Sequence, residues 1–384
     1  MQRVYLDSNA TTPMLPEVFE AMRPFYFDEF GNASSIHHHG QHARAAVERA
    51  RESVARLLGC RAAEIVFTSG GTEADNLAIF GLANSGDHVI TSQVEHHAVL
   101  NACKRLEQRG VEVTYLPVDG QALLDPEDVR KALRPNTKLI SIMTANNETG
   151  VVEPVEEIGR VASEADVYFH TDAVQAAGKI PIDVKKMGCD LLSISGHKFH
   201  GPQGMGALYV RRGTLIDPLF YGGNHERQRR AGTENLPGII GLGRAAEIAM
   251  GGFDDGSLKR IQKMRDRLEA TLLEKIDAAG VNSGAASRVP NTSNIFFDHI
   301  EGEAMVIALD LKGLAVSTGA ACSSGAIEPS HVLTAMGLPP ERARASIRFS
   351  IGKHNTEADI DFALSVIPQT VARLRELSPT YASA

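Results

Sequence analysis

The chain has 384 residues, of which 43% are hydrophobic and 22% are charged, and its formal net charge is −8 at pH 7. This length exceeds what one ordinary hydrophobic core organises, so two domains are expected, and the composition is typical of a globular protein. The negative balance argues against a nucleic-acid partner, and no apolar stretch reaches the ~20 residues that a membrane span requires.

The N-terminus lacks the apolar core of a signal peptide, so we expect a cytoplasmic protein without membrane association. The four cysteines contain no C-x-x-C pair and no zinc-like spacing. In a reducing compartment they are expected to be free thiols, three of which pack in the interior.

Taken in chain order, a short apolar segment at 4–6 ends in a turn, and helical periodicity runs from about residue 17 to residue 58. Strands and helices then alternate. The expected strands are 64–68, 88–91, 112–116, 138–143, 167–170, 191–195 and 207–210. The expected helices are 74–83, 98–108, 126–133 and 154–163. This alternation predicts an α/β fold with a mainly parallel seven-stranded sheet covered on both faces, in which one of the last two strands is free to run antiparallel.

A glycine-rich stretch at 251–256 is the best candidate for a domain boundary. A charged amphipathic helix at about 258–278 follows it. The strands expected after this helix are 294–297, 315–317 and 346–350, which predict a smaller α+β domain. We therefore expect three parts: an N-terminal segment 1–16 that packs on the small domain, a large domain 17–255, and a small domain 256–384.

A candidate phosphate site follows the expected strand at 64–68. Gly70 and Gly71 turn the chain, and Thr72 opens a helix with Asp75 three residues later, in a capping pattern. The N–H groups and the positive dipole end of a helix N-terminus bind anions, although an ordinary capped helix has the same pattern. The Walker and dinucleotide patterns are absent, which favours a single phosphate over a nucleotide.

A carboxylate and a lysine follow two further strands, in Asp172-x-x-Gln175 and Ser195-Gly-His197-Lys198. Ligands bind beyond the carboxyl ends of the strands in open α/β sheets. The pair is what pyridoxal 5′-phosphate requires, because the lysine amine forms the Schiff base and the aspartate keeps the ring nitrogen protonated. Gln175 is placed to bond the phenolic oxygen of the ring, and Ser195 and His197 to bond the phosphate. A helix N-cap is the alternative role of Asp172.

Four other residues have side chains suited to such a site. His96 follows the strand expected at 88–91 and could stack on the cofactor and move protons, and Asn147 follows the strand expected at 138–143. Arg348 lies within an apolar run, where it requires an anion such as a substrate carboxylate. Cys322 lies in a loop rich in serine, glycine and alanine, which favours a reactive thiol over an incidental one. His38 and His42 have ligand spacing without a third ligand, so no metal site is predicted.

In these motifs the chain resembles fold-type I pyridoxal-phosphate enzymes of the class V aminotransferase group, and within it the cysteine desulfurases of the NifS/IscS type. The resemblance extends from Tyr5 to about Asp361. The motifs that carry it are Tyr5-Leu-Asp-x-x-Ala-Thr-Thr12, Phe67-Thr-Ser-Gly-Gly-Thr-Glu73, Glu95-His96, Asn146-Asn-Glu148, His170-x-Asp172-x-x-Gln175, Ser195-Gly-His-Lys198, Arg230-Ala-Gly-Thr233, Ala321-Cys322 and Ser346-Ile-Arg348.

The resemblance implies a homodimer whose site lies near the subunit interface. It makes Lys198 the Schiff-base lysine and Cys322 the nucleophile that forms a persulfide. His96 then stacks on the ring, and Asn147 and Arg348 hold the substrate carboxylate. The residues that it assigns to the ring polar atoms and the phosphate are Asp172, Gln175, Gly71, Thr72, Ser195, His197 and, from the partner subunit, Thr233.

The activity that the resemblance implies is conversion of L-cysteine to L-alanine, with the sulfur passed to an acceptor or iron–sulfur scaffold protein. Cys322 could also ligate a transferred iron–sulfur cluster. The alternatives are a class V aminotransferase or selenocysteine lyase of the same fold, and a cofactor-free scaffold in sulfur assembly. The segment that ends at Ala384 does not resemble the acceptor-docking tail of the housekeeping enzymes, so the acceptor is left open.

Overall fold

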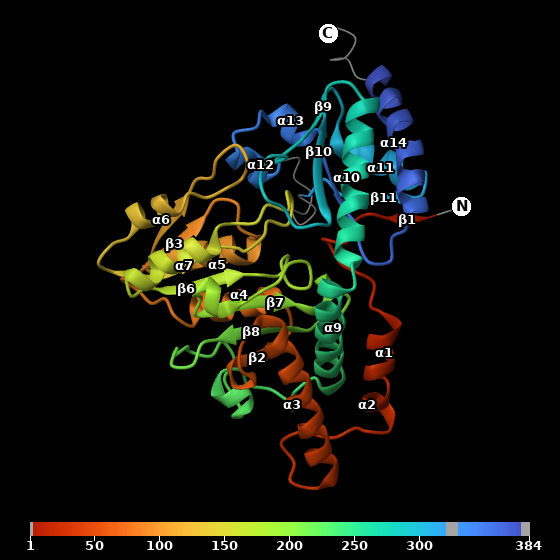
Figure 1. Cartoon of the computed structure of the whole chain (residues 1–384). Coiled ribbons are helices and arrows are strands. Elements are labelled where there is room, and N and C mark those ends of the chain that lie inside the picture. Colours follow the sequence, from red (N-terminus) through yellow and green to blue (C-terminus); the bar gives the residue numbers. More distant parts are fainter. Residues whose placement is uncertain (1–2, 320–328, 378–384) are drawn as a thin grey trace.

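The computed structural model describes residues 3–319 and 329–377 (Figure 1). A large domain is built around a seven-stranded sheet, and a smaller domain lies at one end of the molecule, where both ends of the chain also lie. The long helix α3 (His38–Leu58) extends away from the sheet on the opposite side (Figure 1).

The seven-stranded sheet has the order β2-β8-β7-β6-β5-β3-β4. Within it, β8 pairs antiparallel with both of its neighbours, and every other neighbouring pair is parallel, as the sequence predicts. Its strands are β2 (Ile65–Thr68), β3 (His88–Ser92), β4 (Glu112–Leu116), β5 (Thr137–Ser141), β6 (Tyr168–Asp172), β7 (Leu191–Ser195) and β8 (Gly206–Val210).

Helices cover both faces of this sheet, because residues along each strand alternate between two cores. Ile65 and Phe67 of β2 point into one core, and Val66 points into the other. The helices against the face of Val66 are α4 (Gly71–Phe80) and α5 (His97–Glu107). Those of the opposite core are α1 (Pro16–Met22), α3, α7 (Val155–Glu164) and α9 (Leu236–Asp254), with α6 (Pro126–Ala132) beside α7. The fold predicted from the sequence is therefore confirmed.

The small domain has its own core around an antiparallel sheet of order β12-β10-β9. Its strands are β9 (Ala279–Val281), β10 (Thr292–Phe297) and β12 (Ser346–Ser350), and its longer helices are α10 (Ser257–Lys275), α11 (Gly302–Leu311) and α14 (Glu357–Leu377). Strand β1 (Val4–Tyr5) pairs in parallel with β11 (Leu314–Ala315). The N-terminal residues thus join the small domain before the chain enters the large one.

The short helical segments lie in connections. They are α2 (Pro24–Phe27), α8 (Val184–Met187), α12 (His331–Ala335), α13 (Pro340–Arg344), and the 3-10 segments Ala62–Glu64, Gly196–Lys198 and His225–Gln228.

Two local expectations are wrong. Residues 28–37 are not helical, because the chain makes a turn at residues 32–35 before His37 caps α3. Helix α4 begins at Gly71 without a side-chain cap, so Thr72 and Asp75 form no capping pair. Within the predicted boundary stretch at 251–256, Gly251 and Gly252 still lie inside α9, and Gly256, whose φ is 79°, separates α9 from α10.

None of the helices in residues 3–319 and 329–377 is both long and apolar enough to cross a membrane.

Candidate active site

The candidate residues meet at the carboxyl edge of the large sheet, where the small domain and the N-terminal segment face it (Figure 1). Asp172 ends β6 and Ser195 ends β7, while the turn after β2 leads into α4. Because β2, β6 and β7 run in the same direction, their ends lie along one edge. The predicted grouping of these strand-end residues is therefore present.

Lys198 lies on the 3-10 turn after β7, and the N-terminal segment holds its amine. Its Nζ donates to the backbone oxygens of Asn9 at 2.6 Å and Ala10 at 2.8 Å. Both acceptors are neutral, so the amine is held in place without a carboxylate bonded to it in these two contacts. The arrangement keeps the lysine next to the buried groups of the sheet edge.

Asp172 is the buried carboxylate of the site. Its Oδ1 accepts the N–H of Val174 at 2.8 Å, in a local turn rather than a helix cap. Burial raises the pKa of Asp172 to about 6, against the opposing effects of the Val174 N–H and the nearby Lys198 amine. A carboxylate at this depth is stabilised by any additional N–H donor, such as that of a protonated ring nitrogen.

A second carboxyl group, predicted from the sequence as part of a helix cap, lies close enough to Asp172 to sense its charge. Asp75 on α4 is buried, and its Oδ1 is 3.6 Å from Nε2 of the buried His170. Burial, followed by the charge of Asp172, raises the pKa of Asp75 well above the usual range. Burial and the charge of Asp172 thus both disfavour the ionised form of Asp75.

The turn between β2 and α4 forms a narrow concave surface beside the end of β7. Gly70 has φ of 156°, and a Cβ on Gly71 would lie 2.7 Å from Cγ2 of Val174 and 3.6 Å from Cβ of Ser195. Side chains larger than hydrogen are therefore excluded where α4 begins. The backbone N–H groups of the helix start are left available for an anion.

His197 and Thr72 are the other predicted phosphate residues. His197 is half-buried, and its Nδ1 lies 3.0 Å from the hydroxyl of Thr11. Burial and the Lys198 charge lower the pKa of His197 to about 4, so its ring is neutral at neutral pH. Thr72 is exposed in the first turn of α4. Both side chains come from the elements that carry Lys198 and Gly71.

His96 caps helix α5, which fixes the tautomer of its ring. Nδ1 accepts the N–H of Ala98 at 3.1 Å, so the neutral ring carries its proton on Nε2. Burial, followed by the charge of Lys198, lowers the pKa of His96 to about 4. The ring is therefore a neutral hydrogen-bond donor close to the lysine.

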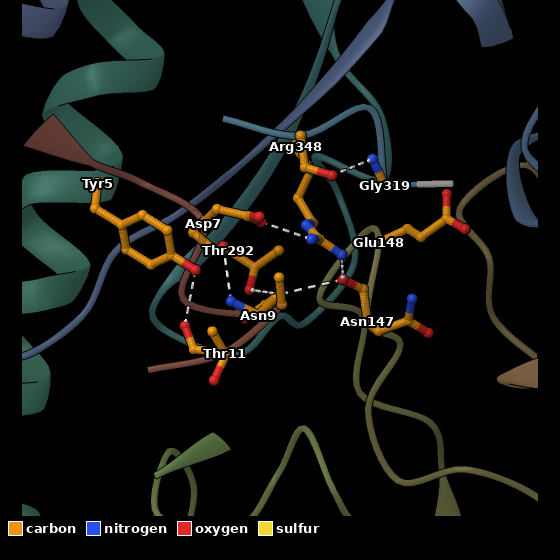
Figure 2. A network of polar contacts seen from close by, with 12 residues as sticks. Tyr5, Asp7, Asn9, Thr11, Asn147, Glu148, Thr292, Gly319 and Arg348 are labelled. Carbon is orange, nitrogen blue, oxygen red and sulfur yellow. Dashed lines mark hydrogen bonds and ion pairs between the residues drawn. The ribbon is translucent and has the colours of Figure 1, made fainter. Parts of the chain in front are cut away.

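Arg348 on β12 already has an anionic partner within the chain. Its Nη2 donates to Oδ1 of Asp7 at 2.7 Å, and its Nη1 donates to the backbone oxygen of Asn147 at 2.9 Å (Figure 2). The side-chain amide of Asn147 makes neither contact. Nε of Arg348 is buried and has no hydrogen-bond partner within residues 3–319 and 329–377. The sequence predicted the need for an anion but not that Asp7 supplies it.

Asn9 links the lysine to the small domain, and sequence reasoning missed it. Its side-chain nitrogen donates to the backbone oxygen of Asn147 and to the hydroxyl of Thr292, as Figure 2 shows. Its side-chain oxygen accepts from Lys179 and Asn291, and its backbone oxygen accepts from Lys198. One buried asparagine thus contacts both domains.

Glu148 connects the described residues on either side of the gap at 320–328. A Cβ on Gly319 would lie 2.9 Å from its Oε2, and the hydroxyl of Ser330 donates to the same oxygen at 2.5 Å. Cys322, the predicted nucleophile, lies outside the described residues.

The other three cysteines have unreactive surroundings. Cys103 and Cys189 are buried and Cys60 is partly buried, and all three are free thiols. Burial raises the pKa of both Cys60 and Cys103 to about 12, and it also raises the pKa of Cys189. Their positions agree with the predicted packing role.

Thr233 lies in the connection between β8 and α9. It is exposed and lines a polar pocket with Ser69 and Arg230, and Lys198 is not among the lining residues. Arg230 donates to Glu73 at 2.9 Å, and Glu73 accepts the N–H of Ser69 at 2.8 Å. This pocket adjoins the outer side of the phosphate turn.

In the described part of the chain, no group of three or more His, Cys, Asp or Glu side chains could hold a metal ion. His42 instead lies 2.9 Å from Oε2 of Glu29.

Residues 4–362, which contain every candidate above, match the family described as Aminotransferase class-V. The chain belongs to this family. A cysteine desulfurase IscS of Dictyoglomus turgidum is 51% identical over 382 residues, covering 98% of this chain and 97% of that protein. The resemblance drawn from the motifs is therefore confirmed.

Two solved structures extend the family likeness to the fold. A NifS-like protein superposes with a TM-score of 0.90 at 38% identity, covering 97% of this chain and all of that one. A structure described as SspA in complex with cysteine superposes with a TM-score of 0.81 at 38% identity, covering 92% of this chain and 99% of that one. In both cases, nearly the whole of the known chain is matched by this member of the class-V aminotransferase family.

Proposed function

We propose that this chain is a cysteine desulfurase that uses pyridoxal 5′-phosphate to convert L-cysteine to L-alanine. The observation that carries the proposal is that Lys198 and the buried Asp172 lie near each other at the sheet edge, next to the start of α4. The names of the relatives agree with it, since proteins about half identical over nearly the full length are called cysteine desulfurases.

The donor set of the site fits the cofactor. The start of α4 at Gly71 and Thr72 would hold the phosphate with Ser195 and His197, and Asp172 would accept the N–H of the ring nitrogen. When bound, the cofactor supplies an electron sink that makes the Cα proton of an amino acid removable.

Within the chain, Lys198 is the group that moves this proton. The carbonyls of Asn9 and Ala10 receive its amine when it is not bonded to the cofactor, so the freed lysine has a fixed position. His96 lies close enough to Lys198 for the charge of the lysine to lower the pKa of the histidine, and in our proposal the neutral ring, with its proton on Nε2, donates a hydrogen bond toward the reacting groups.

Arg348 and Asn147 are proposed to hold the substrate carboxylate. Because Asp7 already pairs with Nη2 of Arg348, an incoming carboxylate has to share the guanidinium or displace Asp7. The buried Nε, unpaired within the described residues, is the donor that remains for such sharing.

Cys322 is proposed as the thiol that receives the sulfur. The carbon–sulfur bond of L-cysteine breaks, the sulfur stays on Cys322 as a persulfide, and the substrate carbon gains a proton to become L-alanine. A thiolate attacks the sulfur, and the thiols of Cys60 and Cys103 stay protonated because burial raises the pKa of each to about 12. The persulfide is then available to an acceptor or iron–sulfur scaffold protein.

The site is proposed to be completed in a homodimer, with Thr233 of the second copy reaching the phosphate. Its support is the exposure of Thr233, whose pocket is lined by Ser69 and Arg230 and not by Lys198.

The direct test incubates the holoenzyme with L-cysteine and a thiol and measures alanine and sulfide. Equal amounts of both products are expected. Cys322→Ser is expected to lose sulfide release entirely, because a hydroxyl cannot accept the sulfur as a persulfide, while Cys103→Ala is the matched control and is expected to retain it.

Sulfide release by Cys322→Ser at the wild-type rate would refute the persulfide step, and transamination without sulfide would favour an aminotransferase. Faster release of selenide from selenocysteine would favour the lyase.

A further inference from the structure

A second lysine, Lys179, lies beside the proposed pyridoxal site. Lys179 is buried, with 8% of its surface exposed, and it lines the same small cavity as Lys198. Its Nζ donates to Oε1 of Gln175 at 2.6 Å and to Oδ1 of Asn9 at 2.9 Å. Among residues 3–319 and 329–377, no ion pair joins it to a carboxylate. Burying an amine costs free energy unless its N–H groups are hydrogen-bonded.

The turn after β6 places this lysine on Gln175. Backbone bonds from residues 176, 177, 179 and 180 wind the segment into helix-like turns, so side chains four positions apart lie on one face. Gly178 has φ of 73°, and a Cβ there would meet Cβ of Phe199 at 2.8 Å. The glycine therefore lets the turn pack against the residue that follows Lys198.

The hydrogen bonds of Lys179 determine which way the Gln175 amide points. An ammonium has donors and no acceptor, so Gln175 must present Oε1 to it and turn Nε2 the other way. Nε2 of Gln175 then donates to the backbone oxygen of Asn9 at 3.0 Å, the same oxygen that accepts from Lys198 at 2.6 Å. The amide N–H₂ and the lysine amine thus converge on one atom.

This orientation is compatible with both charge states of Lys179. Burial, followed by the charges of Lys198 and Arg348, lowers the pKa of Lys179 well below its usual range. The neutral amine still has two N–H groups, which is enough for its bonds to Gln175 and Asn9. The groups that face the amine are those two acceptors together with the two cations, and they come from both domains.

We propose that Lys179 is a positioning residue of the pyridoxal site, which holds the Gln175 amide with its N–H₂ group toward Lys198. The inference rests on the proposed function, because Gln175 acts there by donating to the phenolic oxygen of the cofactor. Lys179 touches neither cofactor nor substrate in this assignment. Its effect passes through Gln175 and Asn9.

The test is a pH titration of the visible absorption band of the holoenzyme, which reports the proton of the Schiff-base linkage. Lys179→Met keeps the length of the side chain and removes its donors. Loss of the donated bond to the phenolic oxygen is expected to shift the titration midpoint to higher pH, in the same direction as Gln175→Leu and at least roughly half as far. The double variant is expected to match Gln175→Leu alone, because the two residues act as a unit.

Three controls separate positioning from a general effect of losing a lysine. Lys353→Met removes a lysine that lines the same cavity but bonds the backbone of Ile248, and its titration is expected to match the wild type. Lys179→Arg keeps the donors and is expected to restore most of the midpoint, with thermal unfolding of the apo forms checking that each variant is folded. Equilibrium dialysis measures the affinity for pyridoxal phosphate as a second readout. We expect Lys179→Met to bind the cofactor several-fold more weakly than the wild type.

The outcomes that overturn the inference differ from those that overturn the function. If Lys179→Met titrates like the wild type, or if its shift adds fully to that of Gln175→Leu, Lys179 does not position Gln175. If borohydride fixes the cofactor on Lys179 and not on Lys198, the roles of the two lysines are exchanged. A wild-type protein that binds no pyridoxal phosphate would overturn both proposals.

Discussion

Glu95, the residue before His96, is a carboxyl group that the folded protein keeps away from water. It is fully buried, and its Oε1 accepts the hydroxyl of Ser92 at 2.7 Å and the N–H of Met143 at 3.0 Å. Burial raises the pKa of Glu95 to about 8, even though both hydrogen bonds lower it. The folded chain therefore binds a proton that the unfolded chain, with a glutamate pKa of ~4.3, has already lost at neutral pH.

Replacing Glu95 with glutamine should change how stability depends on pH. The contribution of the neutral Glu95 is fully present below pH ~4.3 and is lost as the pH rises through about 8, so the wild type loses unfolding free energy relative to Glu95→Gln over this window. The loss is at most about 1.4 kcal/mol per pH unit. Urea unfolding of both proteins between about pH 5 and pH 8 measures it. The exposed Glu156→Gln is the control, and a difference that stays constant with pH would contradict the expectation.

Some residues of the site could be predicted from the sequence, because they lie next to elements whose arrangement in space is known in advance. Asp172 and Lys198 each directly follow a buried strand, and parallel strands bring their ends together. Asn9 and Asp7 could not be found in this way, because their partners are far away in sequence: the bond from Lys198 to Asn9 joins residues 189 positions apart. Hydrophobic periodicity carries no information about such contacts.

At the scale of elements, the connection between β8 and α9 depends on one buried ion pair. Arg51 on α3 donates to both carboxylate oxygens of Glu226, at 2.7 and 2.8 Å. Glu226, Arg227 and Gln228 have φ values of 47°, 57° and 67°, which are strained for side chains with a Cβ. Glu226 also accepts the N–H of Phe67 on β2. The pair therefore holds a strained turn against the strand that leads to the phosphate site.

Arg51→Met is expected to destabilise the protein by about 3–5 kcal/mol, because it leaves the buried Glu226 carboxylate without its charged partner. Combining it with Glu226→Leu removes the unpaired charge, so the double variant should recover a large part of the loss. Urea unfolding of the wild type, both single variants and the double variant gives the coupling energy. Losses that simply add would mean that the pair does not act as a unit. The matched surface control is Arg44→Met, which loses a partly exposed contact and should cost less than about 1 kcal/mol.

The elements themselves were mostly predictable. The alternating strands and helices of the large domain follow from periodicity, which reports burial of one or both faces. Glycine is harder to interpret: Gly251 and Gly252 continue α9, the first exposed and the second buried, whereas Gly256 ends the helical path through a positive φ. A glycine in a sequence does not reveal which of these two properties the fold uses.

For the whole molecule, large apolar side chains remain exposed at several places, among them Leu215, Phe220 and Tyr221 in the connection between β8 and α9, and in two further sets. One set lies on α2 and the chain that leads to α3, and it includes Phe27 at 74% and Ile36 at 90% exposure. The other lies on α11, at Ile307 and Leu311. Figure 1 shows α2 and α11 at opposite ends of the molecule, so they form separate surfaces. Exposed apolar side chains gathered on one element commonly contact a partner.

The proposed homodimer uses one of these surfaces, and we expect it to be the α2 surface, which belongs to the same domain as the pyridoxal site and Thr233. Sedimentation should give twice the chain mass of 41.3 kDa. Replacing both Phe27 and Ile36 with aspartate should yield a folded monomer that binds pyridoxal phosphate more weakly, because Thr233 of the second copy no longer reaches the phosphate. Aspartate at both Ile307 and Leu311 is the matched control and should leave a dimer. If the control pair dissociates the dimer and the first pair does not, the interface lies on α11 and Thr233 has no role in the partner's site.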